Sequence, residues 1–388
     1  MKRLVYGGVV GLLLTGLLLA QGRGRAGGAE QAPAAPVQMT TAPEIPFDSV
    51  PDFLKLPEGM NFGEVPGVAV NSKGHVVVLN HQGSTSAPLY GNASTQILEF
   101  DQAGKFVREI GRNVYGLGYS HSVRFDRYDN LWVVDKGTNA VVRFNPAGYV
   151  TLNLGRRPEG PDDPAEAYYR PGRREPPVHV DGMFRQPTDV AWDSDDNIYI
   201  SDGYTNSRVA KFDKRGTWVK SWGSKGSGGA HADENPGQFN TPHNIAIDRQ
   251  NNVYVADRGN RRIQVFDTDG KFLRMIHLNV PYDKKRHPVL GNLSPNPPDE
   301  TAPWTLCITT GATQYLFTTD QEPGRIYKLS LDGTILGMLG ESGRDAKQFN
   351  WVHGLACPSE DTIVVADMNN WRVQRLTLHA DRAKPSTR

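Results

Sequence analysis

The chain has 388 residues and a nearly even charge balance, with 43 lysines and arginines against 42 acidic residues. This balance excludes the strong basic field with which proteins attract nucleic acid or an anionic membrane surface. Glycine (41 residues) and proline (27 residues) are frequent, and after the N-terminal apolar run no long stretch has apolar residues at a helical period. The length allows two ordinary domains or one large all-β unit, and this composition favours the all-β unit.

The N-terminal stretch "MKRLVYGGVVGLLLTGLLLA" predicts export to the periplasm or the extracellular space. It has a basic start, an apolar run from Leu4 to Leu19 and a small residue at its end, which is the pattern of a secretory signal. The run is close to the shortest length that spans a bilayer, so an uncleaved anchor is the alternative, and we expect no other membrane contact. We assign residues 1–26 to the signal or anchor, residues 27–46 to a disordered linker, residues 47–380 to the folded unit and residues 381–388 to a flexible tail.

A repeated pattern organises the rest of the chain: a strand, an aspartate, a second strand that ends in Phe or Leu, and a turn with glycine. Five turns align, namely "FDQAGKFVREIG", "FNPAGYVTLNLG", "FDKRGTWVKSWG", "FDTDGKFLRMIH" and "LSLDGTILGMLG". Each turn contains a glycine that can take the positive φ of a hairpin turn. A sixth copy, "VHGLACPSEDTIVVADMNNWRVQRLTL", stops after its third strand. We expect residues 52–57, "DFLKLP", to supply its missing outer strand.

Six four-stranded units, closed by an N-terminal strand, predict an all-β six-bladed β-propeller, a fold that leaves only short, protected sheet edges. In such a fold the innermost strand of each blade lines the central channel. An aspartate recurs at the same point of five repeats, which indicates a structural role in hydrogen bonding the backbone of a turn. These aspartates are Asp135, Asp202, Asp257, Asp320 and Asp367.

The two cysteines, Cys307 and Cys357, fall at the same point of neighbouring repeats. An exported chain can join such a pair in a disulfide or keep two buried thiols. Contact between them is feasible, but we prefer the interpretation as two small core residues.

Three histidines occupy one slot, at the entry to the innermost strand of the second, fourth and sixth repeats. They are His121 in "SHSVRFD", His243 in "TPHNIAID" and His353 in "VHGLACP". Alternate blades of a six-fold ring are about 120° apart, so these side chains should converge on the central axis. Three imidazoles with one open position are the ligands of a catalytic zinc ion. The alternative is that the histidines cap loops or hydrogen bond to the backbone.

Two further residues follow the repeat aspartate and should reach the same face as the histidines. Tyr204 lies in "SDGYTNSRV" and Arg258 lies in "ADRGNRRIQVF". The spacing alone is equally compatible with solvated loop residues.

The stretches "FRQPTDVAWDSDDNIYISDGYTNSRVAKF", "GQFNTPHNIAID" and "VYVADRGNRRIQVF" resemble the peptidyl-α-hydroxyglycine α-amidating lyase family, whose members are six-bladed propellers of NHL-type repeats. The resemblance extends over most of residues 50–378. It implies that the zinc ligands are His121, His243 and His353, that Tyr204 is the catalytic tyrosine and that Arg258 is an active-site arginine. The implied reaction converts a small or peptide α-hydroxyglycine amide into an amide and glyoxylate.

The chain departs from the family at several positions. The family has an arginine after its first-blade strand where this chain has Gln82, preceded by His81, and we expect Gln82 to lie at the substrate. The aspartate that binds a structural calcium in the family is replaced by Gly354, which puts calcium in doubt because backbone carbonyls alone make a poor calcium site. Thr205 stands where the family has a disulfide cysteine.

A long insertion after Gly155 contains Arg170 and Arg173, which we expect to bind the substrate in place of the missing arginine. The competing function is a non-catalytic exported propeller that binds protein or glycan. A calcium-dependent lactonase propeller has less support, because it requires a carboxylate and amide set that the three-histidine register does not provide. Zinc content and glyoxylate release separate the lyase from the scaffold.

Overall fold

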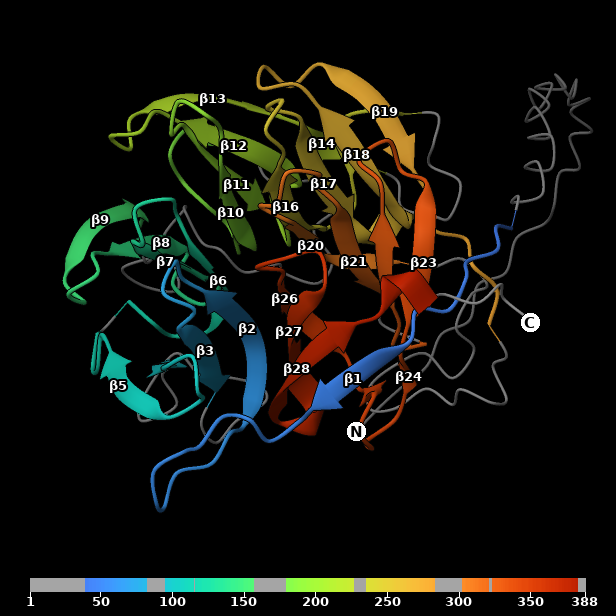
Figure 1. Ribbon diagram of the computed structural model, residues 1–388. Coiled ribbons are helices and arrows are strands. Elements are labelled where there is room, and N and C mark those ends of the chain that lie inside the picture. The colour runs from blue at the N-terminus through green and yellow to red at the C-terminus, as the bar shows by residue number, and fades with distance from the viewer. Residues whose placement is uncertain are drawn as a thin grey trace, which may run out of the picture. The chain divides into compact units, whose positions relative to one another are not determined.

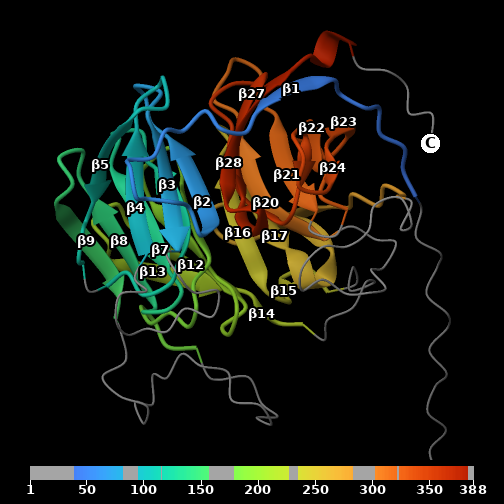
Figure 2. The same cartoon turned by 90° about the horizontal axis from the view of Figure 1, so that it is seen from below.

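The computed structural model describes residues 39–81, 95–114, 116–156, 179–226, 235–282, 302–320 and 323–382. These residues form six four-stranded antiparallel sheets and two short two-stranded sheets. The six larger sheets are arranged as blades around a central axis (Figure 1), and a second view shows their strands running side by side in each blade (Figure 2). The predicted six-bladed β-propeller is therefore confirmed.

The first three blades follow one another along the chain, with the innermost strand first. Blade one consists of β2 (Glu64–Val70), β3 (Val76–His81), β4 (Thr95–Phe100) and β5 (Phe106–Ile110). Blade two consists of β6 (Ser120–Phe125), β7 (Leu131–Asp135), β8 (Ala140–Phe144) and β9 (Val150–Gly155). Blade three consists of β10 (Asp189–Trp192), β11 (Ile198–Asp202), β12 (Arg208–Phe212) and β13 (Trp218–Trp222).

The other three blades repeat this order. Blade four consists of β16 (Pro242–Ile247), β17 (Val253–Asp257), β18 (Arg262–Phe266) and β19 (Phe272–Ile276). Blade five consists of β20 (Pro303–Ile308), β21 (Leu316–Asp320), β22 (Ile326–Leu329) and β23 (Ile335–Leu339). Blade six consists of β26 (Val352–Ala356), β27 (Thr362–Asp367), β28 (Arg372–Leu378) and β1 (Phe47–Val50).

The remaining elements are short. The two-stranded sheets pair β14 (Ser224–Lys225) with β15 (Gln238–Phe239), and β24 (Glu341–Ser342) with β25 (Gln348–Phe349). The 3-10 helices are η2 (Arg258–Asn260), η3 (Met368–Asn370) and η4 (Ala380–Arg382). None of the helices in the described part of the chain is long and apolar enough to span a bilayer. The predicted signal or anchor, residues 1–26, lies outside the described residues.

The core lies between the blades. The middle strands are buried on both faces, as in β11 and β17, whereas outer strands such as β13 are partly exposed. Buried apolar residues of neighbouring blades pack into common clusters. One such cluster contains Val68 and Leu98 of blade one and Val364 and Ala366 of blade six. This packing closes the ring between its first and last blades.

The strand that completes blade six is not the one predicted. β1 (Phe47–Val50) pairs with β28 antiparallel, with Phe47 opposite Leu378. Residues 52–57 lie beside blade one instead, where Lys55 forms an isolated bridge to Lys105. Phe53 and Leu54 of this segment are buried in the cluster between blades six and one, so their apolar side chains fill that interface.

Two boundaries predicted from the sequence also need correction. Residues 39–46, assigned to the disordered linker, are packed against blade five: Ala42 and Ile45 are buried, and the Ile45 N–H donates to the Met338 carbonyl at 2.8 Å. The low apolar content of this segment predicted disorder, but Ala42 and Ile45 are enough to pack it against the blade. The predicted tail begins within η4 (Ala380–Arg382).

The structural role predicted for the repeat aspartates fits their contacts. Asp135, for example, accepts hydrogen bonds from the backbone N–H groups of Tyr119 (2.9 Å) and Thr138 (2.7 Å). Four of the aspartates also pair with a buried or half-buried arginine of the adjacent strand or loop. These pairs are Asp202 with Arg208, Asp257 with Arg262, Asp320 with Arg325 and Asp367 with Arg372. Blades three to six are thus each tied across their second and third strands.

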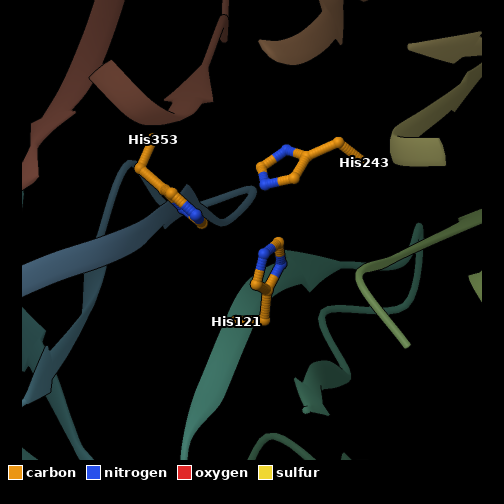
Figure 3. Close-up of side chains that lie close together, drawn as sticks. All are labelled: His121, His243 and His353. Atoms are coloured by element: carbon orange, nitrogen blue, oxygen red, sulfur yellow. The ribbon is translucent and has the colours of Figure 1, made fainter. Parts of the chain in front are cut away.

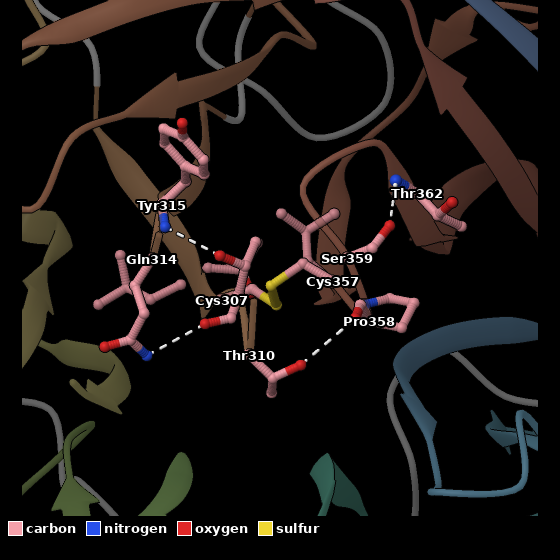
Figure 4. Close-up of a disulfide and its surroundings, with 12 residues drawn as sticks. Cys307, Thr310, Gln314, Tyr315, Cys357, Pro358, Ser359 and Thr362 are labelled. Atoms are coloured by element: carbon pink, nitrogen blue, oxygen red, sulfur yellow. Dashed lines mark hydrogen bonds between the residues drawn. A yellow bond between two sulfur atoms is a disulfide. The ribbon is translucent and has the colours of Figure 1, made fainter. Parts of the chain in front are cut away.

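Cys307 and Cys357 form a disulfide, so the preferred interpretation as two separate thiols is wrong. Cys307 lies on β20 and Cys357 directly follows β26, which places the bond between the innermost strands of blades five and six (Figure 4). Their Cα atoms are 6.0 Å apart, within the usual range for a disulfide. By strand register Ala356 is the equivalent of Cys307, and Cys357 lies one residue further along. The side-by-side placement of the two inner strands brings the sulfur atoms together, which the spacing of the repeats alone could not decide.

The disulfide should stabilise the propeller measurably. It closes a loop with a sequence separation of 50 residues, and restricting the unfolded chain to that extent contributes about 2–4 kcal/mol. We therefore expect the double variant Cys307→Ala/Cys357→Ala to unfold at a lower urea concentration than the oxidised wild type. Wild-type protein treated with a reductant is the matched control and should approach the variant. Equal unfolding midpoints for the oxidised wild type and the variant would contradict this expectation.

Candidate metal centre

Each of the three histidines is the extra residue of a β-bulge on an innermost strand. In β6 the pairing with β7 skips His121, since Ser120 and Ser122 face the consecutive residues Asp135 and Val134. The pairings of β16 with β17 and of β26 with β27 skip His243 and His353 in the same way. A bulge turns a side chain out of the regular alternation of a strand. The three imidazoles consequently point toward one spot on the axis (Figure 3).

The three rings are close enough to share one ion. One nitrogen of each histidine lies within 4.8 Å of the others. The ring centroids are 4.6 Å apart for His121 and His243, 4.6 Å for His121 and His353, and 5.0 Å for His243 and His353. All three side chains are buried. The convergence predicted from alternate blades is therefore present in the structure.

A backbone hydrogen bond fixes the orientation of each ring. The Nδ1 atom of His121 lies 2.7 Å from the Thr188 carbonyl, that of His243 lies 2.8 Å from the Trp304 carbonyl, and that of His353 lies 2.7 Å from the Pro66 carbonyl. A carbonyl only accepts, so each Nδ1 carries the proton and each Nε2 carries a lone pair that can bind a metal ion. Thr188, Trp304 and Pro66 occupy the histidine slot of the next blade.

Burial keeps the three histidines neutral. Desolvation lowers the pKa of His121 and His243 well below the ordinary value, followed by the effects of His353 and Lys136 on His121 and of Arg258 on His243. Desolvation lowers the pKa of His353 to about 3, against the opposing effect of its hydrogen bond to Pro66. The neutral imidazole is the form that binds a metal ion.

These features fit a metal ion. The Nε2 atom of His243 is buried and has no hydrogen-bond partner within the described residues, which costs free energy unless a ligand engages it. Two further Nε2 atoms converge beside it, and all three rings hold their Nδ1–H groups on carbonyl oxygens, as metal-binding histidines commonly do. The triad can therefore hold a metal ion through three nitrogens.

The position of the family's calcium aspartate does not fit a calcium ion. Gly354 supplies no carboxylate, and a Cβ atom at this residue would lie 3.0 Å from both the Gly67 Cα atom and the Pro66 oxygen. The innermost strands of blades one and six approach so closely that a side chain at this position would force them apart. Calcium prefers six or more oxygen ligands, which backbone groups at this point do not supply.

Tyr204 lies directly beside the triad. Its hydroxyl oxygen is 3.2 Å from Nε2 of His121, and its ring packs edge-on against the rings of His121 and His243. Gly203 makes this placement possible, because a Cβ atom there would lie 2.0 Å from the Pro242 carbonyl oxygen. The glycine of "SDGY" therefore allows blade three to approach blade four closely and brings the tyrosine to the axis.

Arg258 and Lys136 make the surroundings of Tyr204 positive. The Arg258 guanidinium carbon lies 5.2 Å from the centroid of the Tyr204 ring and 4.0 Å from that of Trp304, and the Lys136 Nζ atom lies 4.3 Å from the centroid of the Tyr204 ring. Burial by itself raises the pKa of Tyr204, but the two positive charges outweigh burial and hold this pKa below the ordinary value of a phenol.

The structure brings together five of the eight residues predicted for the site: His121, His243, His353, Tyr204 and Arg258. Gln82, Arg170 and Arg173 lie outside the described residues, and their substrate-binding role stays a prediction. Lys136 was not among the residues predicted for the site. It follows Asp135 just as Arg258 follows Asp257, so aligning "VVDKG" with "VADRG" would have found it.

Comparisons with known proteins show which families the chain resembles. Residues 183–286 match a protein-family model described as a 6-bladed beta-propeller. The chain is 28% identical over 341 residues to the mouse peptidyl-glycine alpha-amidating monooxygenase, across 82% of this chain and 31% of the mouse protein. It is 27% identical over 220 residues to a probable peptidyl-alpha-hydroxyglycine alpha-amidating lyase of Caenorhabditis elegans, across 53% of this chain and 55% of that protein. The predicted relationship to the amidating-lyase family is confirmed, and the matched regions span about a third to a half of these relatives.

Solved structures show the same architecture. A virginiamycin B lyase from Staphylococcus aureus has a TM-score of 0.53 to this chain, with 15% sequence identity over 87% of this chain and 100% of that one. At this level of identity the likeness shows the fold alone.

The buried triad should make the metal-free protein sensitive to acid. The folded pKa values lie below the unfolded value of about 6.5, so the unfolded chain binds more protons below that pH. The stability contributed by each neutral histidine is complete above pH 6.5 and is lost as the pH falls toward its folded pKa.

Urea unfolding of the metal-free wild type and of His353→Gln at two pH values measures this contribution. Between pH 7 and pH 5 the wild type should lose about 2 kcal/mol more of its free energy of unfolding than the variant loses. Val219→Ala, which changes an exposed side chain without a titratable group, should lose as much as the wild type. An equal loss for the wild type and His353→Gln would contradict the assignment.

Proposed function

We propose that the chain is a zinc-dependent lyase that cleaves an α-hydroxyglycine amide into an amide and glyoxylate. The observation that carries the proposal is the buried triad of His121, His243 and His353, with the Tyr204 hydroxyl 3.2 Å from Nε2 of His121. The similarity to proteins named as amidating lyases supports the same class of reaction.

Zinc is the metal that suits this ligand set best. Three neutral imidazole nitrogens are soft enough to favour zinc over calcium or magnesium, and they leave a fourth position of a tetrahedral ion for a substrate. Zinc held by these residues would stabilise the negative charge that develops on the substrate during the reaction.

Tyr204 is the residue we assign to proton transfer. As a phenolate, its oxygen would accept the proton of the substrate's hydroxyl group, which must lie within hydrogen-bond reach of it. Phenols are weak acids with pKa values near 10, so a phenolate near neutral pH requires a positive environment. Arg258 and Lys136 supply that environment, since both cations lie against the Tyr204 ring.

The reaction balances without an oxidant or a reductant. The electrons of the hydroxyl O–H bond form the carbonyl bond of glyoxylate, and the carbon–nitrogen bond breaks. Its electron pair remains on the nitrogen, which takes up a proton and leaves as the amide. Arg258 is held against the faces of Trp304 and Tyr204, where its fixed charge would stabilise the negative charge that develops.

We place this reaction outside the cytoplasm, because the N-terminal residues have the pattern of an export signal. The expected partner is a small or peptide substrate that carries an α-hydroxyglycine. The competing function, an exported scaffold that binds protein or glycan, requires neither zinc nor glyoxylate release.

Glyoxylate release from N-benzoyl-α-hydroxyglycine by the zinc-loaded protein tests the proposal. We expect turnover by the wild type and a fall in kcat of about 100-fold or more in Tyr204→Phe, because the variant keeps the ring but loses the proton acceptor. The matched control, Tyr149→Phe, changes a tyrosine that is 72% exposed on the outer strand region of blade two and should leave kcat unchanged. Zinc content should be the same in all three proteins.

Each other outcome counts against the proposal in a specific way. A protein without stoichiometric zinc and without glyoxylate release favours the scaffold. A protein with zinc but without release excludes this lyase reaction and leaves the metal site. Full activity in Tyr204→Phe would remove the proton-transfer role of Tyr204.

A further inference from the structure

Lys136 has the same place in blade two that Arg258 has in blade four. Asp135 faces Ser120 on the innermost strand of its blade, and Asp257 faces Pro242 on the innermost strand of its own. The residue after each aspartate is a cation, and both cations lie at the triad. In blade one His81 faces Glu64 in the equivalent register, so Gln82 is the counterpart of Lys136 in the sequence.

The side chain of Lys136 is held by aromatic rings instead of by a carboxylate. Its Nζ atom lies 4.6 Å from the centroid of the Tyr119 ring and 4.3 Å from that of the Tyr204 ring. Tyr119 in turn stacks against His81, with a centroid distance of 4.3 Å. The Lys136 N–H also donates to the Tyr119 carbonyl at 3.0 Å, which anchors the backbone from which the side chain extends. The ammonium group therefore lies near two tyrosine rings, one of which, that of Tyr204, contacts the triad.

The absence of an anionic partner within the described residues distinguishes Lys136 and Arg258, the two cations at the triad, from the cations that pair with the repeat aspartates. Arg208, Arg262, Arg325 and Arg372 each pair with the aspartate of their own blade. Within the described residues no Asp or Glu oxygen lies within ion-pair distance of the Lys136 Nζ atom, although the side chain is half-buried. A cation that is partly withdrawn from water without a counter-ion is costly, and that cost is recovered when an anion binds.

We propose that Lys136 binds the carboxylate of the substrate, an inference that rests on the proposed function. In an α-hydroxyglycine the carboxylate and the hydroxyl are attached to the same carbon atom. A cation that binds the carboxylate must therefore lie beside the residue that takes the hydroxyl proton, and Lys136 lies against Tyr204.

Arg258 can share this part, because its Nη1 atom is buried and has no hydrogen-bond partner within the described residues. Its guanidinium lies 4.0 Å from the centroid of the Trp304 ring and also contacts Tyr204, so both cations lie against aromatic rings. Lys136 adds a compact charge on a flexible stem, which can reach a carboxylate at a range of positions.

The inference defines the substrate class. The site should select α-hydroxyglycine amides with a free carboxylate over the corresponding esters or amides, because only the free acid pairs with Lys136. N-benzoylglycine is a suitable probe, since it has the carboxylate and the amide but lacks the hydroxyl and cannot react.

Calorimetric binding of N-benzoylglycine and of its methyl ester to the zinc-loaded protein tests the inference. Lys136→Gln should weaken binding of the acid by about tenfold or more and leave binding of the ester unchanged. Lys136→Arg keeps the charge and should retain part of the affinity for the acid. Lys214→Gln, which changes an exposed lysine in a turn of blade three, is the matched control and should bind both probes like the wild type.

Three results would overturn the inference: no binding of the acid by the wild type, equal binding of the acid by the wild type and Lys136→Gln, or an equal loss for the acid and the ester. Zinc content and the circular dichroism spectrum show whether each variant is folded and loaded. Binding is measured without turnover, so the experiment distinguishes failure of the carboxylate site from failure of the lyase reaction. Lys136-dependent binding without glyoxylate release would reject the lyase reaction and keep the carboxylate site, whereas glyoxylate release with unchanged binding in Lys136→Gln would reject the carboxylate site alone.

Discussion

The hydrogen bond from each histidine Nδ1 to a carbonyl of the following blade is the interaction on which the site depends. His121, His243 and His353 donate to the backbone of blades three, five and one, respectively. Imidazoles and carbonyls therefore alternate around the axis, and each bond fixes both the tautomer and the direction of a ring. The same bonds join blades two to three, four to five and six to one. The same three hydrogen bonds therefore close the ring of blades and orient the metal ligands.

Arg124, three residues after His121 on β6, also holds the innermost strands together. The Arg124 guanidinium donates to Asp189 (2.7 Å) and to the Asn244 side-chain oxygen (2.7 Å), and also to the carbonyls of Leu306 (2.9 Å) and Leu355 (3.2 Å). One side chain of blade two thus contacts the innermost strands of blades three, four, five and six. The positive charge of Arg124 thus holds these strands around the axis. Gly354, near the triad, has no carboxylate that could bind a metal cation there.

The features that repeat along the chain could be predicted from the sequence. The fold followed from the spacing of strands and turns, and the triad followed from one slot in alternate repeats, because a rotationally symmetric fold converts equal sequence positions into equal positions around an axis. The bulges explain why these histidines reach the axis, but a bulge has no signature in a single strand sequence.

The features that depend on contacts between different repeats were missed or misassigned. Cys307 and Cys357 form a disulfide because two inner strands lie side by side, and an alignment of repeats gives no distance between blades. β1 (Phe47–Val50) completes blade six because its backbone matches the free edge of β28, and four residues carry too little pattern to be recognised. Lys136 repeats the position of Arg258, but its proximity to Tyr204 became evident only from the geometry.

The central claim is that three imidazoles from alternate blades hold one zinc ion. X-ray absorption at the zinc edge of the purified protein measures this arrangement directly. The claim predicts one zinc ion per chain with three nitrogen ligands at about 2.0–2.1 Å and a fourth ligand from water, and a loss of that ion in His243→Ala. A zinc-free protein, or a zinc ion whose ligand set is unchanged in His243→Ala, would contradict it.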